Sequence, residues 1–241
     1  MTTNEFVPLP STGRRFETTR RVRLADADPS GRLRLDALAR FLQDVGNDDT
    51  ADAGFDTATP WIARRTAVRA IDGAWPRIAE RLDITTWCGG TGTHWAERRT
   101  RLVSPSATVD VAATWVHVDE ATGRPQRLPA WFSETYAPAA QGRTISARLR
   151  FDAPPEGAST WPWPLRWADL DVLGHVNNAA TWEVVEEAAR RRGVVPAEAT
   201  LEYGAAIEID DDVVVHESGP TLWLVVDGTV RARATITNFV E

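Results

Sequence analysis

The chain has 241 residues with 27 cationic and 34 acidic side chains, which gives a formal net charge of −7. Every cation is arginine, and the acidic balance argues against general nucleic-acid binding, for which a basic excess is typical. The single cysteine excludes an intrachain disulfide. The sequence contains neither the roughly 18 consecutive apolar residues of a membrane span nor the apolar core of a signal peptide. We therefore expect a cytoplasmic protein that binds no membrane.

The first predicted elements belong to an internal repeat. Residues 22–31 align with residues 165–174 without a gap, and both copies contain the frame Arg-x-Ala-Asp-x-Asp-x-x-Gly. An amphipathic helix pattern follows each copy, over residues 35–45 in the first half and 178–193 in the second. A chance match is the alternative, but the same order of helix and strands follows both copies, which favours a duplication.

Each predicted helix is followed by four segments with β-strand patterning and turn residues between them. The segments are residues 61–71, 81–88, 94–104 and 108–119 in the first half, and 199–207, 212–217, 221–226 and 229–239 in the second. Asp227-Gly228 is predicted to form a tight hairpin turn. A long helix wrapped by an antiparallel sheet in each half gives an α+β fold.

The two halves are joined by short irregular segments at residues 137–142 and 152–157. Neither segment is long enough to be a free tether, so we expect the halves to pack against each other as a pseudo-dimer. The predicted domains are residues 1–140 and 141–241.

The segment before the second helix carries the densest group of candidate functional side chains. We expect a short strand that ends in the carboxylates Asp169 and Asp171, followed by a turn at Gly174. The helix is expected to start with Asn177 or Asn178 as its N-cap. Free backbone N–H groups and the positive end of the dipole meet at the start of a helix. Such donors can stabilise the oxyanion that develops during acyl transfer.

His175 lies just before this helix start, where the first repeat has Arg32. A histidine beside a carboxylate can orient or deprotonate a water molecule, and Asp171, four residues upstream, is its natural partner. The alternative is a capped helix with a surface imidazole, in which Asn177 and Asn178 are caps and not catalysts. Only the second half carries this pair, which indicates one working site and one supporting half.

Other residues give weaker signals. Cys88 precedes Gly89-Gly90 and is more typical of a buried, inert thiol than of a nucleophile. The remaining histidines show no metal-ligand spacing, so we predict no metal and no cofactor; they are His94, His117 and His216. The arginines at 190–192 suit the negative end of a helix dipole, with docking of an acidic carrier protein as the alternative. Arg98, Arg99 and Arg101 are weaker candidates for such docking.

The sequence Asp-Leu-Asp-x-x-x-His-Val-Asn-Asn at residues 169–178, followed by Trp182 and Glu186, resembles the second-half signature of the acyl carrier protein (acyl-ACP) thioesterases of plants and bacteria. Leu42-Gln-Asp and Leu201-Glu-Tyr also resemble landmarks of that family, and the resemblance covers essentially the whole chain. It implies two tandem hot-dog domains, hydrolysis of fatty acyl-ACP to free fatty acid and ACP, and no metal or redox cofactor.

Residue by residue, the resemblance carries the family's catalytic aspartate and histidine onto Asp171 and His175. Family members usually have an asparagine two residues before the histidine, where this chain has Leu173. They also commonly have a glutamate at the position of Ala206, and Glu208 is the nearest carboxylate here.

The sequence therefore predicts a thioesterase in which His175 activates water and Asp171 orients His175. Backbone amides at the start of the second helix, around Asn177 and Asn178, would hold the oxyanion, and the first-half helix around residues 38–47 would line the acyl pocket. Two alternatives remain open, namely an acyl-CoA thioesterase of the same fold and a non-catalytic protein that binds acyl thioesters. The expected partner is acyl-ACP or acyl-CoA, and two chains can still associate as a homodimer.

Overall fold

The computed structural model describes residues 6–55, 60–71, 73–149 and 151–238. The strands of this part of the chain form one ten-stranded sheet in the order β1-β3-β4-β5-β2-β7-β10-β9-β8-β6. All neighbouring strands in it are antiparallel. The strands are β1 (Arg15–Arg21), β2 (Trp61–Ile71), β3 (Arg81–Thr91), β4 (Trp95–Val103), β5 (Thr108–His117), β6 (Ser159–Pro162), β7 (Pro196–Tyr203), β8 (Val214–Ser218), β9 (Thr221–Val226) and β10 (Thr229–Asn238).

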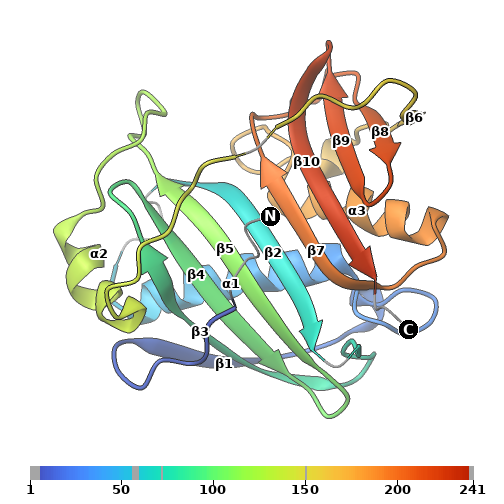
Figure 1. Ribbon diagram of the computed structural model, residues 1–241. Helices are drawn as coiled ribbons and strands as arrows, with labels where there is room; N and C mark the ends of the chain where they lie inside the picture. Colours follow the sequence, from blue (N-terminus) through green and yellow to red (C-terminus); the bar gives the residue numbers. More distant parts are fainter. Residues whose placement is uncertain (1–5, 56–59, 72, 150, 239–241) are drawn as a thin grey trace.

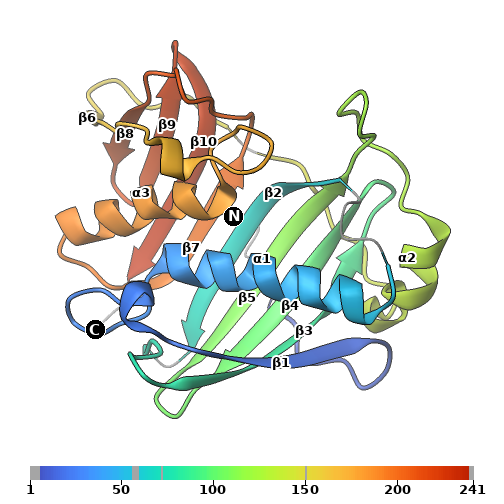
Figure 2. The same cartoon turned by 180° about the vertical axis from the view of Figure 1, so that it is seen from behind.

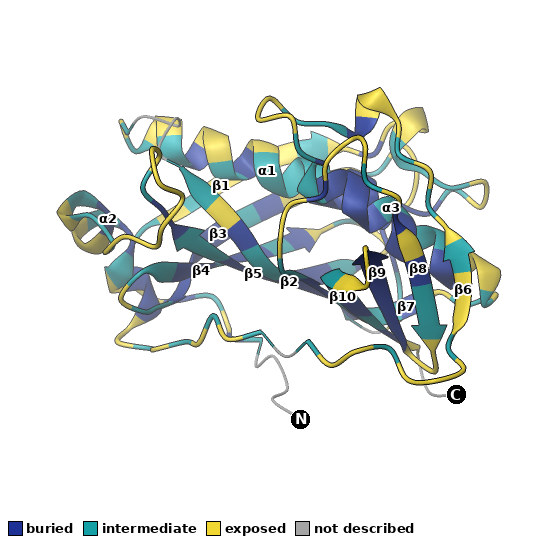
Figure 3. Cartoon of the chain, turned by 90° about the horizontal axis from the view of Figure 1, so that it is seen from above, coloured by how far each residue is buried: buried dark blue, intermediate teal, exposed yellow. Residues whose placement is uncertain are grey.

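Two long helices, α1 (Leu35–Asp52) and α3 (Asn178–Arg191), lie side by side on one face of this sheet (Figures 1 and 2). The segment that connects the two halves runs along the opposite face (Figure 3). The shorter helical elements are α2 (Ala130–Thr135) and the 3-10 turns η1 (Leu24–Asp26), η2 (Ala137–Ala140) and η3 (Trp167–Asp169). Each half therefore has one long helix wrapped by antiparallel strands, as the sequence predicted.

The two halves join where β2 pairs with β7 in the middle of the sheet. Residues from Arg65 to Arg69 of β2 lie opposite residues from Glu202 to Glu198 of β7. The guanidinium of Arg69 donates two hydrogen bonds to Glu198, at 3.0 and 2.9 Å. Because backbone ladder and ion pair both cross this junction, the halves form one continuous sheet and not two tethered bodies.

The core lies between the two helices and the sheet. α1 buries Leu35, Leu38 and Val45, which have the helical spacing that the sequence analysis identified. α3 contributes Trp182 and Val185, whose exposed fractions are 1% and 0%. Burial of these apolar side chains is the main favourable term for packing the helices on the sheet.

Several predicted boundaries differ from the structure. α1 continues past the predicted end at residue 45 to Asp52, and the buried carboxylate of Asp49 in that extension is held by the Arg14 guanidinium at 2.8 Å. The strand predicted over residues 199–207 ends at Tyr203. The last residue of the predicted 229–239 strand lies outside the described residues. The predicted hairpin is confirmed, since Asp227 and Gly228 both have positive φ, at 47° and 73°.

The prediction of a strand that ends in Asp169 and Asp171 is wrong. Residues 167–169 instead form the 3-10 turn η3, and the nearest strand, β6, ends at Pro162. The cause is the side chain of Asp169, which accepts hydrogen bonds from the backbone N–H of Arg166 at 2.8 Å and from its guanidinium at 2.6 Å. These bonds satisfy the backbone locally, so the segment does not need a strand partner.

In the described part of the chain, no helix has the length and apolar character that crossing a membrane requires.

Replacement of Trp182 by alanine is expected to lower the free energy of unfolding by about 3–5 kcal/mol, because it opens a large cavity between α3 and the sheet. Trp167→Ala is the matched control, since Trp167 is 84% exposed and its loss is expected to cost less than about 0.5 kcal/mol. Chemical denaturation of both variants measures the difference. Equal losses would mean that the α3 packing described here is wrong.

Candidate active site

A tight turn held by Asp171 stands directly before α3. The Asp171 carboxylate oxygen Oδ1 accepts the backbone N–H groups of Leu173 at 2.8 Å and His175 at 3.4 Å. Gly174 has a φ of 81°, a conformation that glycine adopts without the penalty that a Cβ would bring. The side chain of Asp171 therefore fixes the path by which the chain enters the helix.

The first repeat builds the same turn before α1. Oδ1 of Asp28 accepts the N–H groups of Ser30 at 2.8 Å and Arg32 at 3.0 Å, and Gly31 has a φ of 85°. The two turns therefore agree in their backbone hydrogen bonds and in the glycine that closes them. The shared frame in the sequence corresponds to a shared local structure.

The second carboxylate oxygen distinguishes the two turns. In the first half, Oδ2 of Asp28 accepts Nε of Arg32 at 3.0 Å. Burial alone would raise the pKa of Asp28, but hydrogen bonds from Ser30 and Arg32 hold this pKa below its ordinary value. In the second half, Oδ2 of Asp171 and the ring of His175 make no hydrogen bond to any described residue. Asp171 thus contacts the backbone of His175 and not its ring.

Each turn faces the long helix of the other half. Arg32 forms an ion pair with Glu186 of α3, and the other oxygen of Glu186 accepts the backbone N–H of Leu35 at 3.0 Å. At the corresponding place in α1 stands Gln43, whose amide donates to Oδ1 of Asn177 at 3.1 Å. A carboxylate therefore occupies the first helix start, and a neutral amide stands beside the second.

The start of α3 presents a backbone donor to the site. The prediction of a cap at this helix start is confirmed for Asn177, since its Oδ1 accepts the N–H of Ala179 at 2.7 Å. The N–H of Asn177 is itself taken by the carbonyl of Asp169 at 2.8 Å. The N–H of Asn178 has no acceptor among the described residues, and it is the counterpart of the Leu35 N–H that Glu186 occupies in the first half.

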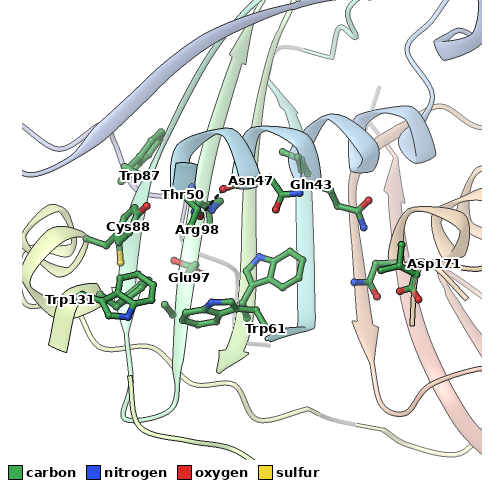
Figure 4. A pocket seen from close by; sticks show the side chains of 18 residues that line it. Gln43, Asn47, Thr50, Trp61, Trp87, Cys88, Glu97, Arg98, Trp131 and Asp171 are labelled. Carbon is green, nitrogen blue, oxygen red and sulfur yellow. Dashed lines mark hydrogen bonds between the residues drawn. The ribbon is translucent and has the colours of Figure 1, made fainter. Parts of the chain in front are cut away.

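A cavity of about 400 Å³ begins at this helix start and runs along α1. Figure 4 shows Gln43 and Asn47 on one side of the cavity, Trp61 facing them, Asp171 at one end and Trp131 at the other. The residues that line it are Leu42, Gln43, Gly46, Asn47, Thr50, Trp61, Trp87, Cys88, Ala96, Glu97, Arg98, Trp115, Trp131, Phe132, Tyr136, Asp171, Val172 and Asn178. Asp171 and Asn178 thus line the cavity, whereas His175 of the same turn is not among its lining residues.

A second cavity, of about 820 Å³, lies at the equivalent place in the first half. Asp28, Arg32 and Glu186 line it, and the ion pairs among them fill the position of the catalytic candidates. Arginine stays charged at all ordinary pH values and cannot act as a base. The first half therefore lacks the chemistry that the second half offers.

The remaining candidates from the sequence have structural partners. Arg190 and Arg191 are both bonded to Glu187, and Arg192 is bonded to Glu217, so each of these guanidinium groups is paired with a carboxylate. Among the described residues, no three His, Cys, Asp or Glu side chains gather closely enough to hold a metal ion.

Glu208 lies beside the turn, because residues 175 and 208 form an isolated antiparallel bridge and the Val176 N–H donates to the carbonyl of Ile207 at 2.9 Å. The Glu208 N–H is accepted by Asp211 at 2.9 Å, and the residue itself is exposed. The backbone of Glu208, two residues after Ala206, therefore lies beside that of His175.

The predicted pocket stretch at residues 38–47 does line the cavity and includes Gln43, but sequence reasoning gave Gln43 no role of its own and missed the aromatic end of the cavity. Gln43 could have been found from the repeat, because it aligns with Glu186, a position where both halves carry a polar side chain inside a helix. Trp131 and Tyr136 gave no such signal, since they lie in the segment after the last strand of the first half and reach the site only through the fold.

Comparisons with known proteins agree with this architecture. The chain matches the family models of the acyl-ACP thioesterase N-terminal domain over residues 13–136 and of its C-terminal domain over residues 153–237. An uncharacterized protein of Mycobacterium tuberculosis is 28% identical over 239 residues, which cover 96% of this chain and 95% of that protein.

Two solved structures resemble this chain over most of its length. A Lactobacillus plantarum protein provisionally named an oleoyl thioesterase has a TM-score of 0.77 at 18% identity, covering 97% of this chain and 100% of that chain. The 12:0-ACP thioesterase from Umbellularia californica has a TM-score of 0.75 at 19% identity, covering 92% of this chain and 96% of that chain. At these identities the likeness shows the fold, which is the double hot-dog fold.

Cys88 is expected to behave as an inert thiol although it lines the cavity. Burial raises its pKa to about 11, so its thiolate fraction at neutral pH should be roughly two orders of magnitude below that of a free cysteine. Mass spectrometry after iodoacetamide treatment of the native protein should find Cys88 unmodified while the unfolded chain is labelled. Labelling at equal rates would contradict the assignment of a protonated, protected thiol.

Proposed function

We propose that this chain, which belongs to the acyl-ACP thioesterase family, hydrolyses the thioester between an acyl group and the phosphopantetheine arm of acyl carrier protein. The observation that carries the proposal is that three features meet in the turn and helix start that border one end of the cavity. They are the unpaired Asn178 N–H, the Asp171 carboxylate with one open oxygen, and His175 in the same turn. We place the reaction in the cytoplasm.

The thioester carbonyl would lie at the start of α3, with its oxygen toward the N–H of Asn178. In the first half the equivalent Leu35 N–H binds a carboxylate oxygen of Glu186 at 3.0 Å, so this position of the frame suits an oxygen that carries negative charge. A preorganised donor aimed at the developing oxyanion lowers the barrier to acyl transfer. Gln43 supports the arrangement because it holds the Asn177 side chain that caps the helix.

His175 would take the proton from the attacking water, with Oδ2 of Asp171 accepting the other ring N–H. Arg32 already makes the corresponding contact to Oδ2 of Asp28 at 3.0 Å, so a rotation of the imidazole brings it to an oxygen within reach. Water attacks the carbonyl carbon, the carbon–sulfur bond breaks, and the imidazolium returns its proton to the departing thiolate. No covalent acyl-enzyme is needed, since a general base acts directly on water.

The neutral amide of Gln43 is what keeps the second half open to substrate. A carboxylate at that position, like Glu186 in the first half, would compete with the oxyanion for the helix donors and repel its charge. The first half instead stabilises the fold, with Arg32 bonded to both Asp28 and Glu186.

Replacement of His175 by alanine is expected to lower kcat/KM for acyl-ACP by about a hundredfold or more, because it removes the general base. Thiol release from purified protein measures the effect. The matched control is Asp28→Asn, which alters the equivalent turn of the first half and should retain activity within about threefold.

The same thiol-release assay shows whether the acyl carrier protein thioester or the coenzyme A thioester is the better substrate. With equal acyl groups, the proposal expects a higher kcat/KM for the ACP thioester than for the CoA thioester. A higher value for CoA would favour an acyl-CoA thioesterase. Tight acyl-thioester binding without thiol release would refute hydrolysis altogether, and full activity in His175→Ala would refute the mechanism.

A further inference from the structure

Aromatic rings outnumber aliphatic side chains in the wall of the cavity that extends from the candidate catalytic turn. Of the 18 residues that line it, only Leu42, Ala96 and Val172 are aliphatic. The six aromatic residues are Trp61, Trp87, Trp115, Trp131, Phe132 and Tyr136. Flexible aliphatic side chains, which adapt to a bending alkyl chain, are thus in the minority.

These rings hold one another in fixed positions. Trp131 stacks on Phe55 with ring centroids 4.3 Å apart, and Phe132 stacks on Tyr136 at 5.1 Å. Trp61 is tilted against Phe132 at 5.3 Å. Aromatic pairs of this kind favour offset or edge contacts with a further ring, so the cavity offers a preformed place for a planar group.

A guanidinium group lies inside the cavity, between the catalytic turn and the Trp131 end. Nη1 of Arg98 donates to the carboxylate of Asp49 and, at 3.4 Å, to the hydroxyl of Thr86. Nε and Nη2 of Arg98 make no hydrogen bond to any described residue, although guanidinium carries five N–H donors. Gly46 of α1 leaves room above this group, since a Cβ added there would lie 3.8 Å from Nε of Arg98.

The charges around Arg98 are balanced. The Asp49 side chain, which is 2% exposed, also binds Arg14 at 2.8 Å, and Arg14 binds Asp52 at 2.6 Å. Two guanidinium groups therefore meet two carboxylates, so a further full negative charge is not needed here. The open donors of Arg98, with the amide of Asn47 on the same cavity wall, suit a neutral oxygen acceptor.

The distance between the catalytic turn and Arg98 sets where a polar group of the ligand must lie. Gln43 stands beside the catalytic turn and Asp49 beside Arg98. These residues are six positions apart on α1, which at 1.5 Å per residue corresponds to about 9 Å. That distance suits an oxygen carried on a ring that a short linker joins to the thioester.

We propose that the acyl group hydrolysed at this site carries an aromatic ring and, on the ring side away from the thioester, a neutral oxygen such as a hydroxyl or oxo group that accepts hydrogen bonds from Arg98. This inference rests on the proposed thioesterase function and names its substrate class. A plain alkyl end at this place would cover the open donors of Arg98 without replacing their hydrogen bonds to water, which is costly.

The test compares four CoA thioesters, and the same acyl groups on acyl carrier protein, with the full-length chain. The acyl groups are 4-hydroxyphenylacetyl, phenylacetyl, octanoyl and palmitoyl. We expect kcat/KM for 4-hydroxyphenylacetyl to exceed that for phenylacetyl by about tenfold, and both to exceed the values for octanoyl and palmitoyl.

The role of Arg98 is measured by the ratio of kcat/KM for the 4-hydroxyphenylacetyl thioester to kcat/KM for the phenylacetyl thioester. In Arg98→Met this ratio of kcat/KM values should fall to about one. Because loss of Arg98 also removes a partner of buried Asp49, Asn47→Ala provides a second variant on an exposed helix position, and it should lower the ratio in the same direction. Asp44→Ala, an exposed position of α1 outside the cavity lining, is the control and should leave the ratio unchanged.

Faster hydrolysis of octanoyl or palmitoyl thioesters than of both aryl thioesters would overturn the inference and leave the thioesterase function standing. An unchanged ratio in both Arg98→Met and Asn47→Ala would also overturn it. Absence of thiol release from all four acyl groups would overturn the proposed function and this inference together.

Discussion

The structure depends on a carboxylate that holds the backbone just before each long helix. Asp171 accepts two N–H groups of the turn that leads into α3, and Asp28 does the same before α1. These bonds fix where the helix starts and which N–H group faces the opposite half. Asn178 lines the cavity for this reason, and the geometry of the candidate site follows from that start.

The two copies of the repeated segment carry different side chains at equivalent positions. In the first half, Arg32 and Glu186 satisfy each other and the Leu35 N–H, which closes the site with charges that need a partner when buried. In the second half, His175 replaces the arginine and Gln43 replaces the glutamate. A donor, a titratable ring and an open carboxylate oxygen then remain for a substrate. One half thus supports the fold, and the other can be committed to a reaction.

The sequence predicted the features that depend on local bonds. The repeat, the two long helices, the Asn177 cap and the turn at Asp227-Gly228 could all be found, because each follows from spacing or from backbone requirements of neighbouring residues. The strand before Asp169 was predicted wrongly, since a side-chain bond to Arg166 closes a 3-10 turn there. The Asp49–Arg98 pair could not be found at all, because the two residues, 49 positions apart in sequence, meet only when α1 packs on β4 of the sheet.

The central claim is that Asp171 and His175 act as one unit at the start of α3. A double-mutant cycle on kcat/KM with Asp171→Asn, His175→Ala and the double variant measures this most directly. If the carboxylate works through the imidazole, the double variant will be about as slow as His175→Ala alone, because the second change removes nothing further. If the fold-losses in kcat/KM of the two single variants multiply in the double variant, the residues contribute independently and the account of the site is wrong.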